Sequence, residues 1–145
     1  MGKFATGVTV VLTEMNGEVH GMTVNAFMSV SLNPKLVTIS IGENARFLQK
    51  IKSSNVFSVN ILAADQADYS RIFSGKLKDD FQIDFNYLNG KPVLPGSLAQ
   101  IACEVVAEHT EGDHVLFIGK VADIHVEEKA PLIFYSGKYH SLADK

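Results

Sequence analysis

Short runs of alternating or continuous apolar residues dominate the chain, and this pattern predicts strands more often than helices. Residues 8–13 are mostly β-branched, and the Asn16-Gly17 pair that follows is the strongest short signal for a hairpin turn. The returning strand is then predicted over residues 18–32. Residues 36–41 form an almost continuous apolar run, which is typical of a strand buried on both faces.

Two segments change to a helical period. The first is predicted over residues 44–52, with Asn44 as its N-cap and one apolar face formed by Phe47, Leu48 and Ile51. The second is predicted from Asp65, as its N-cap, to about Phe73. Both helices are short and amphipathic, so we expect them to lie against a larger sheet rather than to form a core of their own.

The rest of the pattern adds strands and one long excursion. Residues 75–97 have the weakest regularity, and long loops of compact domains are commonly functional or disordered. Further strands are predicted at residues 56–62, 97–109, 114–126 and 132–136. Roughly seven strands with two short accessory helices predict a mainly β fold, a β-barrel, and we expect residues 1–145 to form a single domain.

The composition excludes several classes of protein. The 145 residues include one cysteine, which excludes an internal disulfide framework and CxxC zinc or redox motifs. With 13 Lys and Arg against 16 Asp and Glu, the formal net charge of −3 is too balanced for a dedicated nucleic-acid binder. No apolar stretch approaches the about 20 residues of a membrane helix, so we expect no membrane partner and a cytoplasmic location. No two glycines are two residues apart, and a GxG loop of the Rossmann or kinase type is therefore absent.

The segment from Thr23 to Leu32 is the most informative part of the sequence. Its even positions are apolar and are predicted to pack on a core, because alternate side chains of a strand point to opposite faces. Its odd positions carry three hydroxyls, an amide and an aromatic ring, without a charge. One interpretation is an ordinary solvated face of an antiparallel sheet; the other is a face that binds a flat, polar ligand through short neutral groups. These residues alone favour neither.

Three other positions carry candidate chemistry. His114 follows Gly112-Asp113, so it either belongs to a turn chosen for its conformation or places an imidazole at the rim of a pocket. Arg46, near the start of the first helix, is either solvated or meets a phosphate. Cys103 lies in an apolar strand, which predicts a buried structural thiol. No histidines have a paired metal-ligand spacing, so no metal site is predicted.

Six segments stand in a fixed order along the chain: Phe-Ala-Thr-Gly-Val-Thr-Val-Val (4–11), His-Gly-Met-Thr-Val-Asn-Ala-Phe-Met-Ser-Val-Ser-Leu-Asn-Pro (20–34), Phe-Ser-Val-Asn-Ile-Leu (57–62), Gly-Asp-His (112–114), Ile-Gly-Lys-Val (118–121) and Pro-Leu-Ile-Phe-Tyr-Ser-Gly-Lys-Tyr (131–139). This ordered set resembles the short-chain flavin reductase family, which provides the reductase components of two-component flavin monooxygenases. The set covers essentially the whole chain and is much more specific than any one of its members.

The resemblance implies an FMN-binding split β-barrel that works as a homodimer, with the flavin near the subunit interface. It implies that NADH or NADPH reduces FMN or FAD, with hydride passing from nicotinamide C4 to flavin N5 between rings stacked at roughly 3–3.5 Å. The implied partner is a flavin-dependent monooxygenase that receives the reduced flavin. The missing GxG loop agrees with a dinucleotide that binds in a folded pose on the flavin instead of on a Rossmann unit.

Carried over residue by residue, the resemblance assigns a stretch along the flavin ring, a strand that continues it and a loop that reaches the ribityl phosphate. The ring stretch comprises Thr23, Val24, Asn25 and Ala26. The continuing strand comprises Ser29, Val30 and Ser31. The phosphate loop runs over residues 41–46 and includes Ile41, Gly42, Asn44 and Arg46.

The resemblance also assigns the nicotinamide side of the site. His114 matches the histidine associated with the nicotinamide and is the expected catalytic residue, and Tyr139 borders the same pocket. Many members have serine where this chain has Ala26, so a hydrogen bond to the flavin at this position is expected from the backbone. Members also usually have more residues before the Phe-Ala-Thr-Gly segment.

Two alternatives keep the same fold. A ferric reductase would use bound flavin to reduce iron chelates, and a non-enzymatic FMN-binding electron carrier would only hold the flavin. His114 distinguishes these alternatives in principle, because a carrier has no need of a nicotinamide contact.

Overall fold

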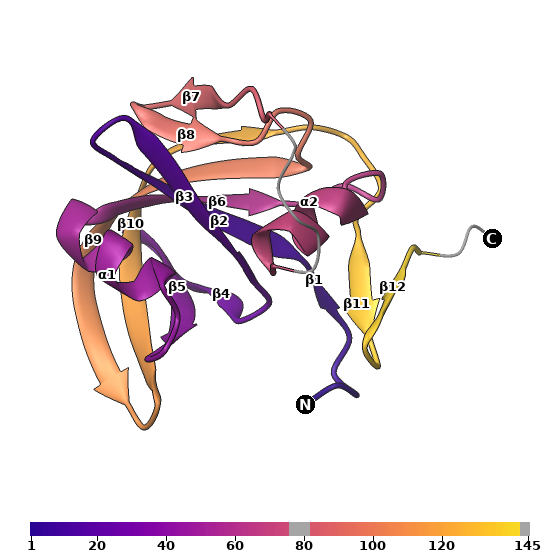
Figure 1. Cartoon of the computed structure of the whole chain (residues 1–145), viewed down its shortest axis with the longest axis horizontal. Coiled ribbons are helices and arrows are strands. Elements are labelled where there is room, and N and C mark those ends of the chain that lie inside the picture. The colour runs from indigo at the N-terminus through magenta and orange to yellow at the C-terminus, as the bar shows by residue number, and fades with distance from the viewer. Residues whose placement is uncertain (76–81, 143–145) are drawn as a thin grey trace.

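A computed structural model describes residues 1–75 and 82–142 and shows a mainly β protein (Figure 1). The two helices of this part of the chain are α1 (Phe47–Ser54) and α2 (Ala67–Phe73). The strands are β1 (Thr6–Gly7), β2 (Thr9–Met15), β3 (Glu18–Val24), β4 (Phe27–Leu32), β5 (Lys35–Gly42), β6 (Val56–Ile61), β7 (Asn86–Leu88), β8 (Lys91–Val93), β9 (Ala99–Glu111), β10 (His114–Val126), β11 (Ile133–Tyr135) and β12 (Lys138–His140).

The main element is a seven-stranded sheet in the order β3-β2-β6-β9-β10-β5-β4. Its neighbouring strands are antiparallel throughout. A three-stranded sheet, β1-β11-β12, joins the two ends of the chain and lies to one side of the main sheet (Figure 1). The strands β7 and β8 form a separate small hairpin.

The predicted first hairpin is confirmed. Met15 pairs with Glu18, and the two residues between them have positive φ, 53° at Asn16 and 80° at Gly17. A two-residue hairpin turn requires a left-handed backbone conformation at both of its central residues, and Asn and Gly adopt this conformation most readily.

The prediction of one continuous strand over residues 18–32 is wrong. This segment forms β3, which pairs with β2 at one edge of the main sheet, and β4, which pairs with β5 at the other. Asn25 and Ala26 make the crossing, with the amide of Phe27 donating to the carbonyl of Asn25 at 3.0 Å. Each half pairs with the strand next to it in the sequence, but the two resulting hairpins lie at opposite edges of the main sheet.

Both helices lie where they were predicted, but both predicted caps are wrong. The helix α1 begins at Phe47, with Arg46 at the cap position and no side-chain cap hydrogen bond, while Asn44 lies in the turn before it. The helix α2 has Gln66 rather than Asp65 at its cap. The Gln66 amide oxygen is instead used by the preceding loop, where it accepts a 2.9 Å hydrogen bond from the amide of Ala63.

The later strands agree with the prediction, and short ones are added to them. The long hairpin is formed by β9 and β10, and the last predicted strand is extended by β12 into a further hairpin. Residues 86–93 of the predicted long excursion form the hairpin β7–β8. Residues 76–81 of that excursion lie outside the described residues. No helix of the described part is long and apolar enough to cross a membrane.

Two apolar clusters form the core. The larger lies inside the seven-stranded sheet and includes the apolar face of α1, as its amphipathic pattern predicted; its largest members are the fully buried rings of Phe57 and Phe117. Burying one such ring stabilises the fold by about 1.5–3 kcal/mol. The smaller cluster attaches the three-stranded sheet and α2 to β2; its buried members are Val8, Val10, Leu12, Leu62, Leu94 and Leu132.

Candidate functional site

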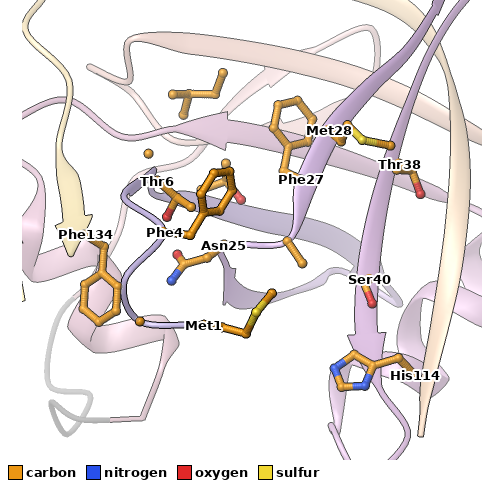
Figure 2. A pocket seen from close by; sticks show the side chains of 15 residues that line it. Met1, Phe4, Thr6, Asn25, Phe27, Met28, Thr38, Ser40, His114 and Phe134 are labelled. Carbon is orange, nitrogen blue, oxygen red and sulfur yellow. The ribbon is translucent and has the colours of Figure 1, made fainter. Parts of the chain in front are cut away.

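A cavity of about 900 Å³ opens between the outward face of β4 and β5 and the three-stranded sheet (Figure 2). In Figure 2, Thr38, Ser40 and His114 lie along one side, Phe134 lies across from them, and Asn25 lies between. The lining residues are Met1, Gly2, Phe4, Thr6, Gly7, Thr9, Asn25, Ala26, Phe27, Met28, Thr38, Ser40, Ile61, His114 and Phe134. A mostly apolar cleft of this size with a few polar groups is the usual form of a site for a small organic ligand.

The strand β5 supplies one wall of the cavity. Val37, Ile39 and Ile41 are buried in the core, whereas the residues between them are only half-buried and face outward. On that outward face, Thr38 donates to the carbonyl of Phe117 at 3.1 Å. Burial on both faces was therefore the wrong expectation for this strand. The alternation of Thr38, Ser40 and Gly42 with apolar residues indicates an outward face, but the apolar residues at the start of the run favour burial on both faces.

In the strand β4, the apolar even-numbered residues, which were expected to face the core, point away from it. Phe27 pairs with Ile39, packs on the larger cluster and also lines the cavity, whereas Met28 pairs with Thr38 and lines the cavity while 60% exposed. The predicted alternation holds only up to Val24, which is buried. Because the chain turns at Asn25–Ala26, the faces exchange after this point, and the apolar even positions become exposed.

Ser29, Val30 and Ser31 lie further along β4 and do not line the cavity. A register shift between Ser29 and Ser31 places Val30 outside the regular pairing with β5. All three belong to the edge strand of the main sheet, beyond Met28 as seen from Asn25. Their assignment to flavin binding stays a prediction.

His114 stands at the rim of the cavity, and Asp113 orients its ring. The Nδ1 atom lies 2.8 Å from Oδ1 of Asp113, and since an ionised carboxylate only accepts, Nδ1–H is the donor. This hydrogen bond holds the pKa of the Asp113 carboxyl below its usual range, with the charge of the imidazole acting in the same direction. Nε2 remains free for a ligand and lies close to Gly42, where a Cβ atom would stand 3.8 Å from it.

The loop of residues 41–46 lies beside this histidine. Gly42 pairs with His114, and the amide of Glu43 donates to the carbonyl of Asp113 at 2.9 Å. Ile41 is buried in the core, so its side chain is not available to a ligand. Asn44 and Arg46 are exposed, and within the described residues Arg46 forms no ion pair.

Thr23 and Tyr139 line a second, smaller cavity of about 190 Å³, together with Ser70 and Ser74. Asn25 and Phe134 line both cavities, so the two are neighbours separated by these side chains. Thr23 donates to the carbonyl of Ser70 at 2.7 Å, and the hydroxyl of Tyr139 lies 2.6 Å from that of Ser70. The predicted site residues are thus divided, with Asn25, Ala26 and His114 in the main cavity and Thr23 and Tyr139 in the side cavity.

Other lining residues carried no local signal in the sequence. Phe4 and Phe134 both line the cavity because β1 pairs with β11, which places Thr6 opposite Phe134.

Cys103 is not part of the site. As predicted, this thiol is buried in the core, and burial raises its pKa to about 12, so it stays protonated and unreactive.

The fold and the cavity define a mainly β protein with a large cavity for a small organic ligand.

A family model described as "Flavin reductase like domain" matches residues 1–143. An NADH-dependent flavin reductase from a Rhodococcus species is 43% identical over 98% of this chain and 82% of its own length. The reductase component of the 4-hydroxyphenylacetate 3-monooxygenase of Thermus thermophilus is 34% identical over 98% of this chain and 92% of its own length.

A solved structure agrees with these relatives. The flavin reductase PheA2 in its native state superposes with a TM-score of 0.97 at 59% identity, covering 99% of this chain and 94% of that one. The chain belongs to the flavin reductase-like family.

Proposed function

We propose that this protein is an NADH-dependent flavin reductase that supplies reduced flavin to a partner monooxygenase. The observation that carries the proposal is the family match over residues 1–143, in a chain whose large cavity places His114 at its rim. Named relatives at 43% and 34% identity are an NADH-dependent flavin reductase and a monooxygenase reductase component. The protein is therefore an oxidoreductase that uses NADH as the donor and flavin, FMN or FAD, as the acceptor.

The residues of the main cavity fit a flavin. Apolar walls, including Phe4, Met28 and Phe134, suit a flat aromatic ring and exclude water from it. Within the described part of the chain, the hydroxyl of Ser40 and the amide of Asn25 make no side-chain hydrogen bond, so both are free to bond polar edges of the ring. The backbone carbonyl of Ala26 accepts a 3.2 Å hydrogen bond from the amide of Ser40.

The phosphate of the flavin requires a donor outside the cavity lining, because no lysine or arginine lines the main cavity as described. Arg46 is the one basic residue of the assigned loop, residues 41–46, and it is exposed. A guanidinium group binds phosphate oxygens in a bidentate manner. Asn44, in the same turn, would add a neutral donor.

His114 is proposed to contact the nicotinamide. Its Nδ1 is engaged by Asp113 at 2.8 Å, so the ring is held with Nε2 available as the free nitrogen. A bound flavin would supply the redox chemistry as the acceptor of hydride from the nicotinamide. The protein's own work is to hold Nε2 of His114 at the rim, to exclude water with the apolar walls and to bond the ring edges through Asn25 and Ser40.

We further propose that the seven-stranded sheet curls into a split barrel formed by a single domain, residues 1–145. One apolar cluster contains side chains from both halves of the sheet, including Val24 of β3 and Val37 of β5, although these strands are not paired with each other. A flat sheet would keep its two ends apart, whereas a curled one brings their inner faces onto one core.

We also propose that the protein is a homodimer with the flavin near the interface. The edge strand β4 exposes Met28, Val30 and Leu32 by 60%, 46% and 87%, and apolar side chains along an unpaired edge mark an interaction surface. Met28 also lines the main cavity, so a second copy seated on β4 would border the flavin. The cytoplasmic location stays a prediction.

The experiment is a set of four assays with the purified protein, pairing FMN or FAD with NADH or NADPH in air and following absorbance at 340 nm. The expected result is turnover of NADH in the presence of flavin. Flavin binding without oxidation of either nicotinamide would leave the electron carrier as the function. Absence of flavin binding at micromolar FMN would overturn the reductase, the ferric reductase and the carrier together.

A further inference from the structure

Phe134 separates the main cavity from the side cavity together with Asn25, since both residues line both cavities. It lies on β11, opposite Thr6, and its ring lies across the cavity from Thr38 and Ser40 of β5 (Figure 2). The position of this ring therefore shapes one wall of the main cavity. The ring packs on the smaller core cluster, and Tyr139 lines the side cavity next to it.

Tyr139 supports Phe134 from that side. The two residues are paired across β11 and β12, so their side chains share a face of the small sheet. Their ring centroids are 5.5 Å apart with the planes at 60°, an edge-to-face contact. A rotation of the Tyr139 ring would withdraw this support.

Tyr139 is in turn held by α2. Its hydroxyl lies 2.6 Å from the hydroxyl of Ser70, a residue that is only 1% exposed. The guanidinium of Arg71 stands 5.0 Å from the centre of the Tyr139 ring and is itself held by Asp68 at 2.9 Å. Among the described residues, the bond between Ser70 and Tyr139 is the only side-chain hydrogen bond that joins the hairpin β11–β12 to α2.

We infer that Ser70 is a positioning residue of the flavin site: through its bond to the hydroxyl of Tyr139 it holds Phe134 as the wall of the main cavity. Serine is a poorer helix former than alanine, so its presence inside α2 is not explained by helix propensity. The inference rests on the proposed function, because it assigns the wall to flavin binding.

The test compares Ser70→Ala, Tyr139→Phe and the double variant with a matched control. The control is Ser54→Ala, which removes a similar hydroxyl pair, Ser54 with Thr13 at 2.7 Å, at the end of α1 and outside both cavities. The readouts are the dissociation constant of FMN without NADH, the absorption difference spectrum of bound FMN, and KM for flavin and kcat in the NADH assay.

We expect each single variant to weaken FMN binding and raise KM for flavin about fivefold, because the ring of Phe134 is no longer held in one position, with kcat nearly unchanged in Ser70→Ala. The double variant is expected to be no worse than either single one, because both act through the same bond. The spectrum of bound FMN should change in these variants and not in Ser54→Ala. Unchanged FMN binding and spectrum in both Ser70→Ala and Tyr139→Phe would overturn the inference, as would an equal effect of Ser54→Ala.

The FMN titration separates this inference from the proposed function. If the natural sequence binds FMN but does not oxidise NADH, the reductase proposal fails while the effect of Ser70 on FMN binding is still measured. If the natural sequence oxidises NADH with FMN and the Ser70 and Tyr139 variants bind FMN as it does, the inference alone fails.

Discussion

Gly42 faces His114 directly across the β5–β10 ladder, and a Cβ atom at Gly42 would stand 3.8 Å from the free nitrogen of the imidazole. That separation is an ordinary van der Waals contact, so a methyl group fits at this position. A branched side chain would add atoms beyond Cβ, next to the imidazole. The glycine thus keeps the space beside Nε2 of His114 free of side-chain atoms.

Replacing Gly42 by valine is expected to lower kcat/KM for NADH about tenfold, because the added methyl groups displace the imidazole or cover Nε2. Valine suits a strand, so the fold should keep its stability. The measurement is steady-state NADH oxidation at saturating FMN. The matched control is Gly42→Ala, for which kcat/KM should stay within about twofold. Equal losses in the two variants would contradict the steric explanation.

His114→Ala should weaken the use of NADH more than the binding of FMN, with KM for NADH rising about tenfold and the dissociation constant of FMN changing by about twofold or less. The reason is that Nε2 lies at the rim of the cavity, apart from the apolar walls that suit the flavin ring. His109→Ala, an exposed histidine opposite Leu116 in the same hairpin, serves as the control and should change neither quantity. Parallel losses of NADH use and FMN binding in His114→Ala would argue against a nicotinamide contact.

The carboxyl of Asp113 should titrate below about 3.9, the ordinary value for aspartate, because its ionised form accepts the hydrogen bond from His114. A lowered pKa means that the ionised form stabilises the folded state at higher pH, and that this contribution is lost as the pH falls through the lowered pKa. The contribution to stability is small since the carboxyl is exposed. NMR titration of Asp113 measures its pKa, which should return toward the ordinary value in His114→Ala and stay low in His109→Ala. A pKa at or above the ordinary value in the natural sequence would refute the assigned geometry.

Gly119→Ala should destabilise the fold by about 1–3 kcal/mol, because it overfills the larger cluster. A Cβ atom at this position would stand 2.5 Å from Cζ of Phe57 and 3.0 Å from Cβ of Cys103, and the fully buried ring of Phe57 has no room to withdraw. Urea unfolding measures the free energy change. Gly7→Ala is the control, because a Cβ atom there would meet no atom within 4 Å. A stability loss in Gly7→Ala as large as in Gly119→Ala would rule out packing as the cause.

If β4 is the dimer interface, Leu32→Glu should convert the protein to monomers, because it places a charge in a surface buried by the second copy. Sedimentation velocity measures the mass, and FMN titration of the same variant tests whether the second copy completes the site. The control is Leu142→Glu, the same change at a leucine that is 65% exposed near the C-terminus, compared with 87% at Leu32. A Leu32→Glu variant that keeps the mass of the natural sequence, if that mass is a dimer, would place the interface elsewhere.

Local chemistry explains which parts of the fold the sequence predicts. The hairpin at Asn16-Gly17 and the buried face of α1 depend on neighbouring residues only, so turn chemistry and periodicity locate them correctly. The division of residues 18–32 sends two neighbouring hairpins, β2–β3 and β4–β5, to opposite edges of the main sheet. That separation depends on the long-range pairings β2–β6 and β5–β10, and the local pattern of residues 18–32 does not contain this information.

The site divides in the same way. His114 and Asn25 could be singled out from sequence motifs, and the structure places both on the main cavity. Phe134 could not, because it reaches the cavity only through the pairing of the last strands with β1. Ser40 alternates with the apolar residues of β5, and this alternation alone predicts an outward-facing hydroxyl. The apolar residues at the start of the strand dominate the pattern and favour a fully buried strand instead.

The pairing of Thr6 with Phe134 builds the cavity from two segments that lie far apart in the sequence. The hairpins β2–β3, β4–β5 and β9–β10 close over short loops, whereas the pairing of β1 with β11 closes a loop that contains the whole main sheet. Pairings of such large sequence separation form slowly, because the entropy of closing the loop must be overcome first. We therefore expect the cavity to be completed late in folding, so that flavin stabilises a sheet that has already formed instead of guiding its formation.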